Sequence, residues 1–321
     1  MLKRHKDLLR TLVGELRTTL AGGAATDDTW QRGDLDRELE RLGVGTDGSL
    51  APIDALYSPT PEERRARRVV DAQLEALPRD QRASAREESC ERAAYSWINR
   101  LLALRAMEAR GLIDETLRAN PDYEGISEAL FVLRSTAPMR TAGADAGWWA
   151  VVEDACTSQA QSLPGLFDPN DPAVALRPST TALLRSISLI GKAPQGFTPD
   201  ESDETFRDPD AVGWAYQFYQ EAAKKRVYAK LGSGGKAGTR AEIAAATQLF
   251  TEPYMVKWLL QNSLGRTYHE LHPDARYRHS GSTTSGPTSS PSQPCTASPR
   301  SRSWIRAWAA ATSCAKRSTC W

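Results

Sequence analysis

The feature that most constrains the fold of this chain is helical periodicity, which runs through most of the sequence. In the longest such segment, from about Arg82 to Arg110, the side chains expected on an inner face recur at steps of three and four residues. They are Ala94, Trp97, Ile98, Leu101, Leu102, Leu104, Arg105 and Met107. This spacing predicts one long helix with a buried side, and Gly111 is its predicted C-cap.

The same periodicity predicts a series of further helices. Leucines at positions 8, 9, 12, 16 and 20 form an amphipathic pattern that stops at Gly22-Gly23. Other helices are expected near residues 60–77, 126–134, 148–162, 179–190, 209–231 and 253–264. Strand alternation is scarce, so the predicted fold class is mainly α, an array of helices.

The composition changes after Asp274. Every Asp and Glu lies at or before this residue, the charged residues after it are all Lys or Arg, and Ser, Thr, Pro and Gly dominate residues 280–303. The net charge of +1 therefore averages a mildly acidic body and a basic tail. Such a tail cannot bury a core, so residues 276–321 are predicted to be disordered.

The body reads as a reduced cytoplasmic protein. Its only cysteines are Cys90 and Cys156, because the other three lie in the tail, and they do not suggest a disulfide framework. The N-terminus leads into an amphipathic helix and not into an apolar signal sequence. No apolar run is long enough to span a membrane, so no membrane association is predicted.

One short motif invites a catalytic interpretation. Amino-methyltransferases use an Asn/Asp-Pro-Pro-Tyr/Phe loop, in which the Asn and a prolyl carbonyl accept hydrogen bonds from the target amine. Residues 120–123 read Asn-Pro-Asp-Tyr, so Asp122 replaces the second Pro. A turn at the end of a helix is the favoured interpretation, and no catalytic residue is assigned.

Three other motifs are weaker. Residues 232–236 (Gly-Ser-Gly-Gly-Lys) resemble a phosphate-binding loop, but Ala237 stands where Ser or Thr would bind magnesium, which favours a flexible linker. His269 and His272 lack the Cys or carboxylate partners of a metal site, so none is predicted. The Lys-Lys-Arg run at 224–226 could contact phosphates, although a solvated helix face explains it as well.

Three blocks of sequence carry a family resemblance. Residues 91–108 resemble a Trp-Phe-Asn-Arg-Leu-x-Ala-Leu-Arg-x-Met-Glu helix, and residues 212–219 resemble a Gly-Trp-x-Tyr-Gln-Phe-Tyr segment. The third block is residues 245–266 with Leu271-His272-Pro273 after it. In combination they resemble the N-terminal part of the adenine-specific DNA methyltransferases of BREX phage-defence systems, the PglX type. Each block also fits helices whose Trp, Leu and Phe residues simply fill a core.

The resemblance implies an organisation and an activity. Residues 1–80 would be N-terminal helices, 81–248 a helical domain, and 249–275 the segment that leads into the S-adenosylmethionine domain. The family is a class I S-adenosylmethionine-dependent enzyme that methylates adenine N6 at specific sites in double-stranded DNA, together with other phage-defence proteins. Its α/β catalytic domain is missing from this sequence, so we expect no activity from the chain alone. The alternative is a non-catalytic helical scaffold that binds DNA or partner proteins.

The resemblance implies cofactor contacts at three positions. Phe250, Thr251 and Pro253 match a Phe-Thr-Pro-like turn that lies against the methionine end of S-adenosylmethionine in related enzymes, with Glu252 inserted between Thr and Pro. Thr251 suits an N-cap and Pro253 a first helical turn, so free backbone N–H groups there could meet the methionine carboxylate. An ordinary capped helix explains the same residues.

The tail suggests a reason for the missing domain. Trp is encoded only by TGG and every Ile codon begins with AT, so reading Trp304-Ile305 from the last base of Trp forces the Asp codon GAT. By the same rule Trp308-Ala309 forces Gly and Cys320-Trp321 forces Leu, and the remaining residues permit the glycine-rich methyl-donor loop of the family. We therefore expect residues 276–321 to be a frameshifted tail, with a genuine disordered tail as the alternative.

Overall fold

The computed structural model describes most of the chain before residue 273. The described residues are 1–24, 30–53, 56, 58–236, 238, 240–247 and 250–272. They fall in two compact units, Met1–Gln248 and Leu249–Trp321. The predictions for the tail at 276–321 lie outside the described residues. Within the described part, no helix is both long enough and apolar enough to cross a membrane.

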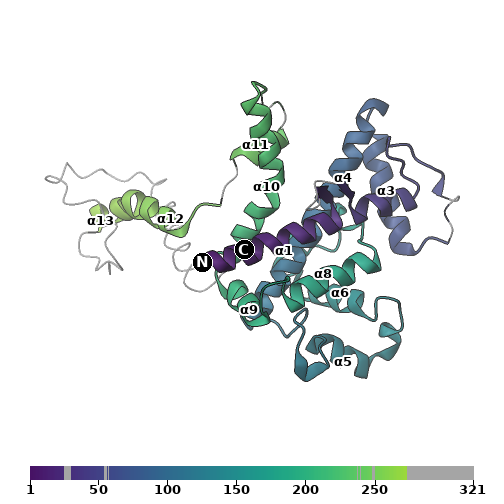
Figure 1. Ribbon diagram of the computed structural model, residues 1–321, viewed down its shortest axis with the longest axis horizontal. Helices are drawn as coiled ribbons and strands as arrows, with labels where there is room; N and C mark the ends of the chain where they lie inside the picture. Colours follow the sequence, from purple (N-terminus) through teal and green to yellow (C-terminus); the bar gives the residue numbers. More distant parts are fainter. Residues whose placement is uncertain are drawn as a thin grey trace. The chain divides into compact units, whose positions relative to one another are not determined.

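The first unit is organised around helix α4 (Arg79–Ala109), its longest element. Helices that pack against α4 come from both ends of the unit, and α1 lies beside α8, α9 and α10 (Figure 1). They are α1 (Lys3–Leu20), α2 (Asp34–Arg41), α3 (Pro61–Glu75), α8 (Thr180–Lys192), α9 (Pro199–Arg207) and α10 (Ala211–Gly232). The prediction of a mainly helical body is confirmed.

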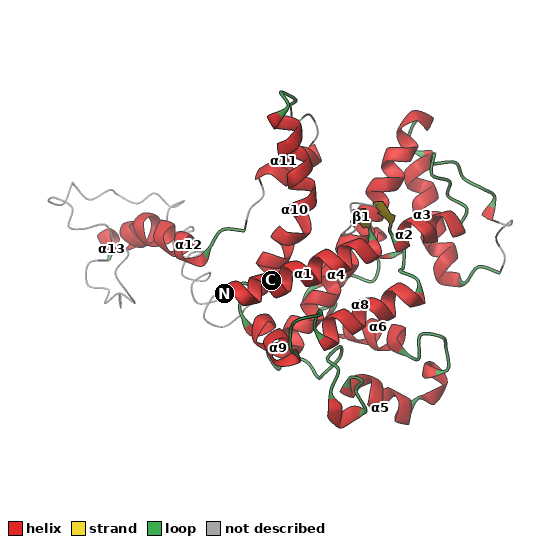
Figure 2. Cartoon of the chain, in the orientation of Figure 1, coloured by secondary structure: helices red, strands yellow, loops and turns green. Residues whose placement is uncertain are grey.

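Shorter elements complete this unit (Figure 2). They are α5 (Glu128–Thr136), α6 (Trp148–Gln159), α7 (Pro164–Phe167), α11 (Arg240–Thr247) and the 3₁₀ turns η2 (Pro121–Tyr123), η3 (Pro138–Thr141) and η4 (Pro172–Val174). Strands β1 (Gly22–Ala24) and β2 (Trp30–Arg32) form one antiparallel pair that the sequence did not predict, because three residues are too few to show alternation. A Cβ at Gly33 would lie 2.3 Å from the carbonyl carbon of Ala21, so this close approach requires glycine.

The predicted apolar faces form the core. The five leucines of α1 are fully buried, and the inner side of α4 contributes Trp97, Leu101 and Leu104, each at most 4% exposed. Met107 is half-buried. Each fully buried apolar side chain of this size stabilises the fold by about 1.5–3 kcal/mol. The apolar faces that predicted these helices are therefore also the surfaces that pack them together.

Helix ends follow local chemistry. The C-cap of α4 is Arg110 and not the predicted Gly111. Gly111 is the next residue, with φ +67°, and the Leu112 N–H donates to the Met107 carbonyl at 2.9 Å, so the helix does end at this glycine. A similar turn ends α10 at residues 232–235, where Gly234 has φ +83° and the Gly235 N–H donates to the Lys230 carbonyl at 2.9 Å. The glycine-rich segment predicted as a flexible linker therefore begins as a helix stop, before α11 packs back on α10 (Figure 1).

Candidate functional site

The segment with the predicted cofactor residues begins a short helix. Helix α12 (Pro253–Leu260) starts with Pro253 in its first turn, as the sequence predicted. Its N-cap is Glu252, with φ −61° and ψ 140°, and not Thr251. Because proline is best placed at the first helical position, the inserted Glu252 takes the capping position and moves Thr251 one residue outside the helix.

Few free N–H groups remain at this helix start. Pro253 has no N–H, and the backbone N–H groups of Met255 and Val256 donate to the Glu252 carbonyl at 2.9 and 3.3 Å. Phe250 is half-buried, whereas Thr251 and Pro253 are exposed. The geometry therefore offers less anion-binding backbone than the sequence suggested. That Phe250, Thr251 and Pro253 contact S-adenosylmethionine stays a prediction.

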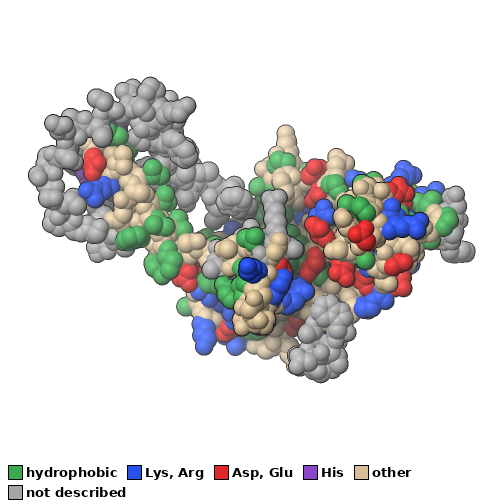
Figure 3. Space-filling model, turned by 90° about the horizontal axis from the view of Figure 1, so that it is seen from above, with side chains coloured by type: hydrophobic (Ala, Val, Ile, Leu, Met, Phe, Trp, Pro, Cys, Tyr) green, Lys and Arg blue, Asp and Glu red, His purple; other side chains and the backbone are tan. Residues whose placement is uncertain are grey.

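Helix α12 exposes several large hydrophobic side chains. Hydrophobic side chains, green in Figure 3, gather on the visible face of the second unit. Those of α12 are 40–59% exposed: Tyr254, Met255, Val256, Trp258 and Leu259. The helix continues through a π-helical stretch (Gln261–Gly265) into α13 (Arg266–Leu271).

The Asn-Pro-Asp-Tyr motif is occupied by structural hydrogen bonds. The Asn120 side-chain oxygen accepts from the Asp122 N–H at 3.0 Å, and its Nδ2 donates to Oε2 of Glu115 at 2.6 Å. The Tyr123 ring lies 5.4 Å from that of Phe131. The motif therefore begins the 3₁₀ turn η2, and the prediction of a turn is confirmed, although no helix ends there. The amide that a methyltransferase would direct at its substrate is used here within the fold.

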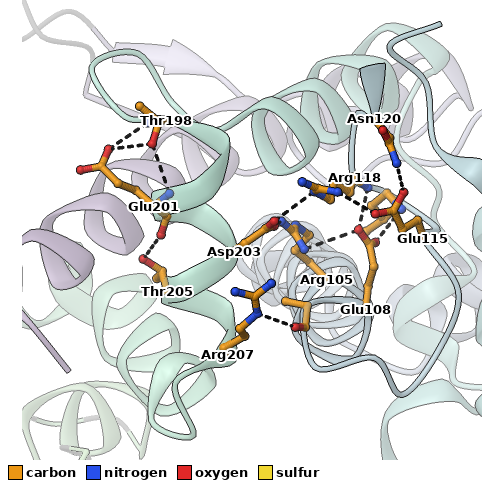
Figure 4. Close-up of polar contacts among 12 residues, drawn as sticks. Arg105, Glu108, Glu115, Arg118, Asn120, Thr198, Glu201, Asp203, Thr205 and Arg207 are labelled. Carbon is orange, nitrogen blue, oxygen red and sulfur yellow. Dashed lines mark hydrogen bonds and ion pairs between the residues drawn. The ribbon is translucent and has the colours of Figure 1, made fainter. Parts of the chain in front are cut away.

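A buried network of charges lies next to this turn (Figure 4). Arg105 of α4 pairs with Asp203 of α9 and lies 3.4 Å from Oε1 of Glu108. Arg118 connects the same Asp203, at 3.0 Å from its Oδ2, with Glu115, at 2.7 Å from its Oε1. The helical spacing predicted Arg105 on the inner side of α4, but it could not identify Asp203 as its partner.

Glu108 joins the network to the main chain. Its carboxylate accepts hydrogen bonds from the backbone N–H groups of Thr116, Leu117 and Arg118 at 3.2, 2.8 and 3.0 Å. Burial raises the pKa of Glu108, while Arg105 and these N–H donors act in the opposite direction. Glu108 thus fixes the segment after α4 against the helix, which is a structural task.

The first two family blocks pack against each other. The Tyr219 hydroxyl of α10 donates to Oε2 of Glu91 on α4 at 2.7 Å, and the Tyr219 ring lies 5.2 Å from Tyr95 in an edge-to-face arrangement. Arg17 of α1 pairs with the same Glu91. Burial, together with the neighbouring Glu91 carboxylate, raises the pKa of Tyr219 well above its ordinary value. These residues therefore hold three helices together.

The remaining motifs form no site among the described residues. No group of His, Cys, Asp and Glu side chains in that part of the chain is arranged to hold a metal ion. The His272 ring lies 4.7 Å from that of Tyr268. In the basic run, Lys225 is exposed and lies 3.7 Å from Glu221, and the Lys224 ammonium is 5.7 Å from the Tyr228 ring. Both contacts suit a solvated helix face.

Comparison with known proteins finds similarity to two methyltransferases. No family model matches the chain. It is 31% identical over 228 residues to the adenine-specific methyltransferase BrxX of Escherichia coli O9:H4 (strain HS), which covers 64% of this chain. It is 26% identical over 264 residues to the adenine-specific methyltransferase PglX of Lacticaseibacillus casei (strain Zhang), which covers 71% of this chain.

The two matches cover 18% and 21% of BrxX and PglX, so the chain spans about a fifth of the length of the curated relatives it matches. Their names agree with the family that the three sequence blocks predicted. The family resemblance is thus confirmed: about two-thirds of this chain or more is similar to one part of the BREX adenine-specific methyltransferases BrxX and PglX.

Proposed function

We propose that this chain is the helical part of a site-specific adenine-N6 DNA methyltransferase that takes part in phage defence. The observation that carries the proposal is the 31% identity to BrxX over 228 residues, which is too long a match for a shared helical pattern alone. In the complete enzyme, S-adenosylmethionine would supply the methyl group, and double-stranded DNA would supply a flipped adenine. Other defence proteins would be its partners, and its location would be cytoplasmic.

The role of this part is to build a framework. The first two family blocks lie on α4 and α10, and their residues join these helices to each other and to α1. The Asn120 motif, the one sequence in the described residues that resembles the catalytic loop, is committed to a turn. A separate class I α/β domain would carry the chemistry, with Phe250, Thr251 and Pro253 beside the methionine end of the cofactor.

A methyl-transfer assay tests the proposal. The chain and the full gene product are incubated with labelled S-adenosylmethionine and duplex DNA, and label on adenine N6 is measured by mass spectrometry of the nucleosides. We expect label from the full gene product and none from this chain. Methylation by this chain alone would overturn the framework role, and its absence from both products would overturn the enzyme proposal.

The frameshift hypothesis has its own test. We propose that residues after Arg276 are read out of frame, and resequencing the gene from this codon through that of Trp321 and beyond the stop decides it. An offset frame that continues into the glycine-rich loop and an Asn-Pro-Pro-Tyr/Phe motif is the expected result. A gene without such a frame would make this a separate helical protein with a basic tail.

The second candidate function is a helical scaffold that contacts DNA without chemistry. The observation that favours it is the basic run of α10, where Lys225 and Arg226 are exposed. Duplex binding by the chain, with a slope against salt concentration that falls when Lys225 and Arg226 are replaced by Gln, would support it. Binding that is absent, or insensitive to both substitutions, would argue against it.

A further inference from the structure

The buried arginines of the first unit differ in their partners. Among the described residues, four arginines are buried: Arg67, Arg86, Arg100 and Arg105. Three of them pair with a carboxylate, namely Arg67 with Asp71, Arg86 with Asp36, and Arg105 with Asp203. In the described part of the chain Arg100 has no carboxylate within 4.0 Å of its nitrogens.

Arg100 is 3% exposed, yet its partners are few. Its Nη2 donates to the Asp168 carbonyl at 2.6 Å, and its guanidinium lies 5.8 Å from the centre of the Trp97 ring. Its Nε is buried and has no hydrogen-bond partner in the described part of the chain. A guanidinium offers five N–H donors and is never neutral in a protein, so a buried one without an anion is costly.

Arg100 lines a cavity. The cavity has a volume of about 310 Å³ and lies among α3, α4, α6 and the segment 167–177. Pro169 and Ala175 are its more accessible apolar lining, and the buried Trp97, Val152, Phe167 and Val174 lie behind them. Cys156 lies beside Arg100. Pockets for small molecules are commonly of this size, mostly apolar, with a few polar groups that fix the ligand.

Most carboxylates around the cavity are already paired with arginines other than Arg100. Three lining carboxylates belong to Glu62, Glu153 and Asp154. Glu153 pairs with Arg177, and Asp154 makes a bidentate pair with Arg140 at 2.8 and 2.9 Å. Glu62 is exposed at the start of α3.

Arg65 adds a second positive charge at the rim. It is exposed, and its Nη2 donates to the Pro169 carbonyl at 2.9 Å and to the Asn170 side-chain oxygen at 3.3 Å. Arg65 and Arg100 therefore line the cavity without a carboxylate partner in the described residues. The one lining carboxylate there without an arginine partner belongs to Glu62. An anion would find a buried fork of donors and a second guanidinium near the entrance.

We propose that this cavity binds a small organic anion, whose phosphate or carboxylate group pairs with Arg100 and whose apolar part lies against Pro169 and Ala175. Arg65 attracts and holds the anion at the rim. The site goes beyond the methyltransferase proposal, because neither the cofactor segment nor the basic face of α10 contributes to it.

Calorimetric titration of the full chain tests the site with three probes at matched ionic strength: inorganic phosphate, phenyl phosphate and benzoate. We expect phenyl phosphate or benzoate to bind more tightly than inorganic phosphate, because only these two place a ring in the apolar part. The comparison of phenyl phosphate with benzoate identifies the anionic group. If none of the three binds at millimolar concentration, the proposal is wrong.

Variants locate the binding. Arg100→Gln is expected to weaken the best probe by about tenfold or more, since a charge-assisted hydrogen-bonded pair is lost. Arg92→Gln is the control, because Arg92 is an exposed arginine on the same helix. It should bind the probe as the unaltered chain does.

Two further variants keep the test decisive if Arg100→Gln does not fold. Both residues are exposed, so their substitution should leave the fold intact. Arg65→Gln should weaken the probe several-fold, and Glu62→Gln should strengthen it, because each changes the charge at the rim. Unchanged affinity in both would place any binding elsewhere and overturn the proposal.

Discussion

Two arginines of the same helix show how differently one residue type can be used. Arg100 and Arg105 both lie on α4 and are 3% and 1% exposed. Arg105 is enclosed by the carboxylates of Asp203 and Glu108, whereas Arg100 donates to one carbonyl and lines a cavity. The Nε of each arginine is buried without a hydrogen-bond partner, so the two differ in their anions: Arg105 has two carboxylates and Arg100 has none among the described residues. Burial alone therefore does not separate a structural arginine from a binding one; its anionic partners do.

The largest expected effect is on stability, and it tests the difference between the two arginines directly. Arg105→Met would leave Glu108 buried without its cation and Asp203 with Arg118 alone, which costs about 3–5 kcal/mol of unfolding free energy. Arg100→Met removes a charge that lacks a carboxylate, so the loss should be about 1 kcal/mol or less. Urea unfolding followed by circular dichroism measures both values. Equal losses would contradict the distinction between the two arginines.

A smaller effect is expected where the Arg105 network meets the Asn120 turn. Asn120→Ala removes the hydrogen bond to Glu115 and the cap on the Asp122 N–H, so we expect a loss of about 1–2 kcal/mol. Asp122→Ala, at an exposed position of the same turn, should change stability by about 0.5 kcal/mol or less.

The same two variants of the full gene product test the catalytic interpretation of the motif. If Asn120 has a structural role, Asn120→Ala should lower the unfolding midpoint. Methylation should be retained at temperatures where the variant is folded. Loss of methylation without loss of stability would restore a catalytic role to this residue.

A third prediction concerns α9, where Glu201 is half-buried, in contrast to the buried Asp203. A hydrogen bond from Arg4, helped by the Thr198 N–H, lowers the pKa of Glu201 to about 2. Because the folded pKa is depressed, its contribution to stability is present above the unfolded value near 4.5 and is lost as the pH falls toward 2. Carboxyl chemical shifts from NMR report this titration.

Substitution identifies the cause of that shift. Arg4→Gln should move the Glu201 titration upward, toward 4.5. Arg10→Gln is the matched control, since Arg10 lies on the same helix and pairs with Asp7 and Glu221 instead. A Glu201 pKa that does not respond to Arg4→Gln would refute the assigned pair.

The smallest expected effect is on the reactivity of two buried thiols, one of which lines the cavity. Burial raises the pKa of Cys156 to about 11 and that of Cys90 to about 12. Both thiols should therefore react slowly with iodoacetamide near neutral pH, with Cys156 the faster by up to about tenfold. Peptide mass spectrometry measures the two rates separately.

An anion in the cavity should slow Cys156 and leave Cys90 unchanged. Cys156 lines the cavity beside Arg100, while Cys90 lies nearer the start of α4. Phenyl phosphate is the probe for this experiment. Slowing of both thiols to the same extent would indicate general stabilisation of the chain and not occupancy of the cavity.

Much of the helical body could be predicted because its information is local. The leucines of α1 and the Trp97 face of α4 repeat at helical spacing over several turns, and the structure buries them. Helix α9 was not predicted, although Thr198 and Glu201 form a capping box. Its nine residues are mostly polar, so no apolar stripe marked it.

The candidate cofactor segment was predicted less well. Pro253 occupies the expected first turn, but Thr251 is not the N-cap, because one inserted residue changes which carbonyl begins the helix. The family match does not resolve that detail. The contact of Phe250, Thr251 and Pro253 with a cofactor stays a prediction.

The sequence by itself determined most of the helices and their buried faces, because periodicity and capping are properties of neighbouring residues, and its three blocks indicated the family resemblance. Only the tertiary structure decided which buried arginine received a carboxylate. Asp203 lies 98 positions from Arg105, while Arg100 donates to the Asp168 carbonyl, 68 positions away, and has no carboxylate partner among the described residues. No local pattern encodes such pairings, since the packing of α9 and α6 against α4 brings one anion close and leaves the other arginine beside a cavity.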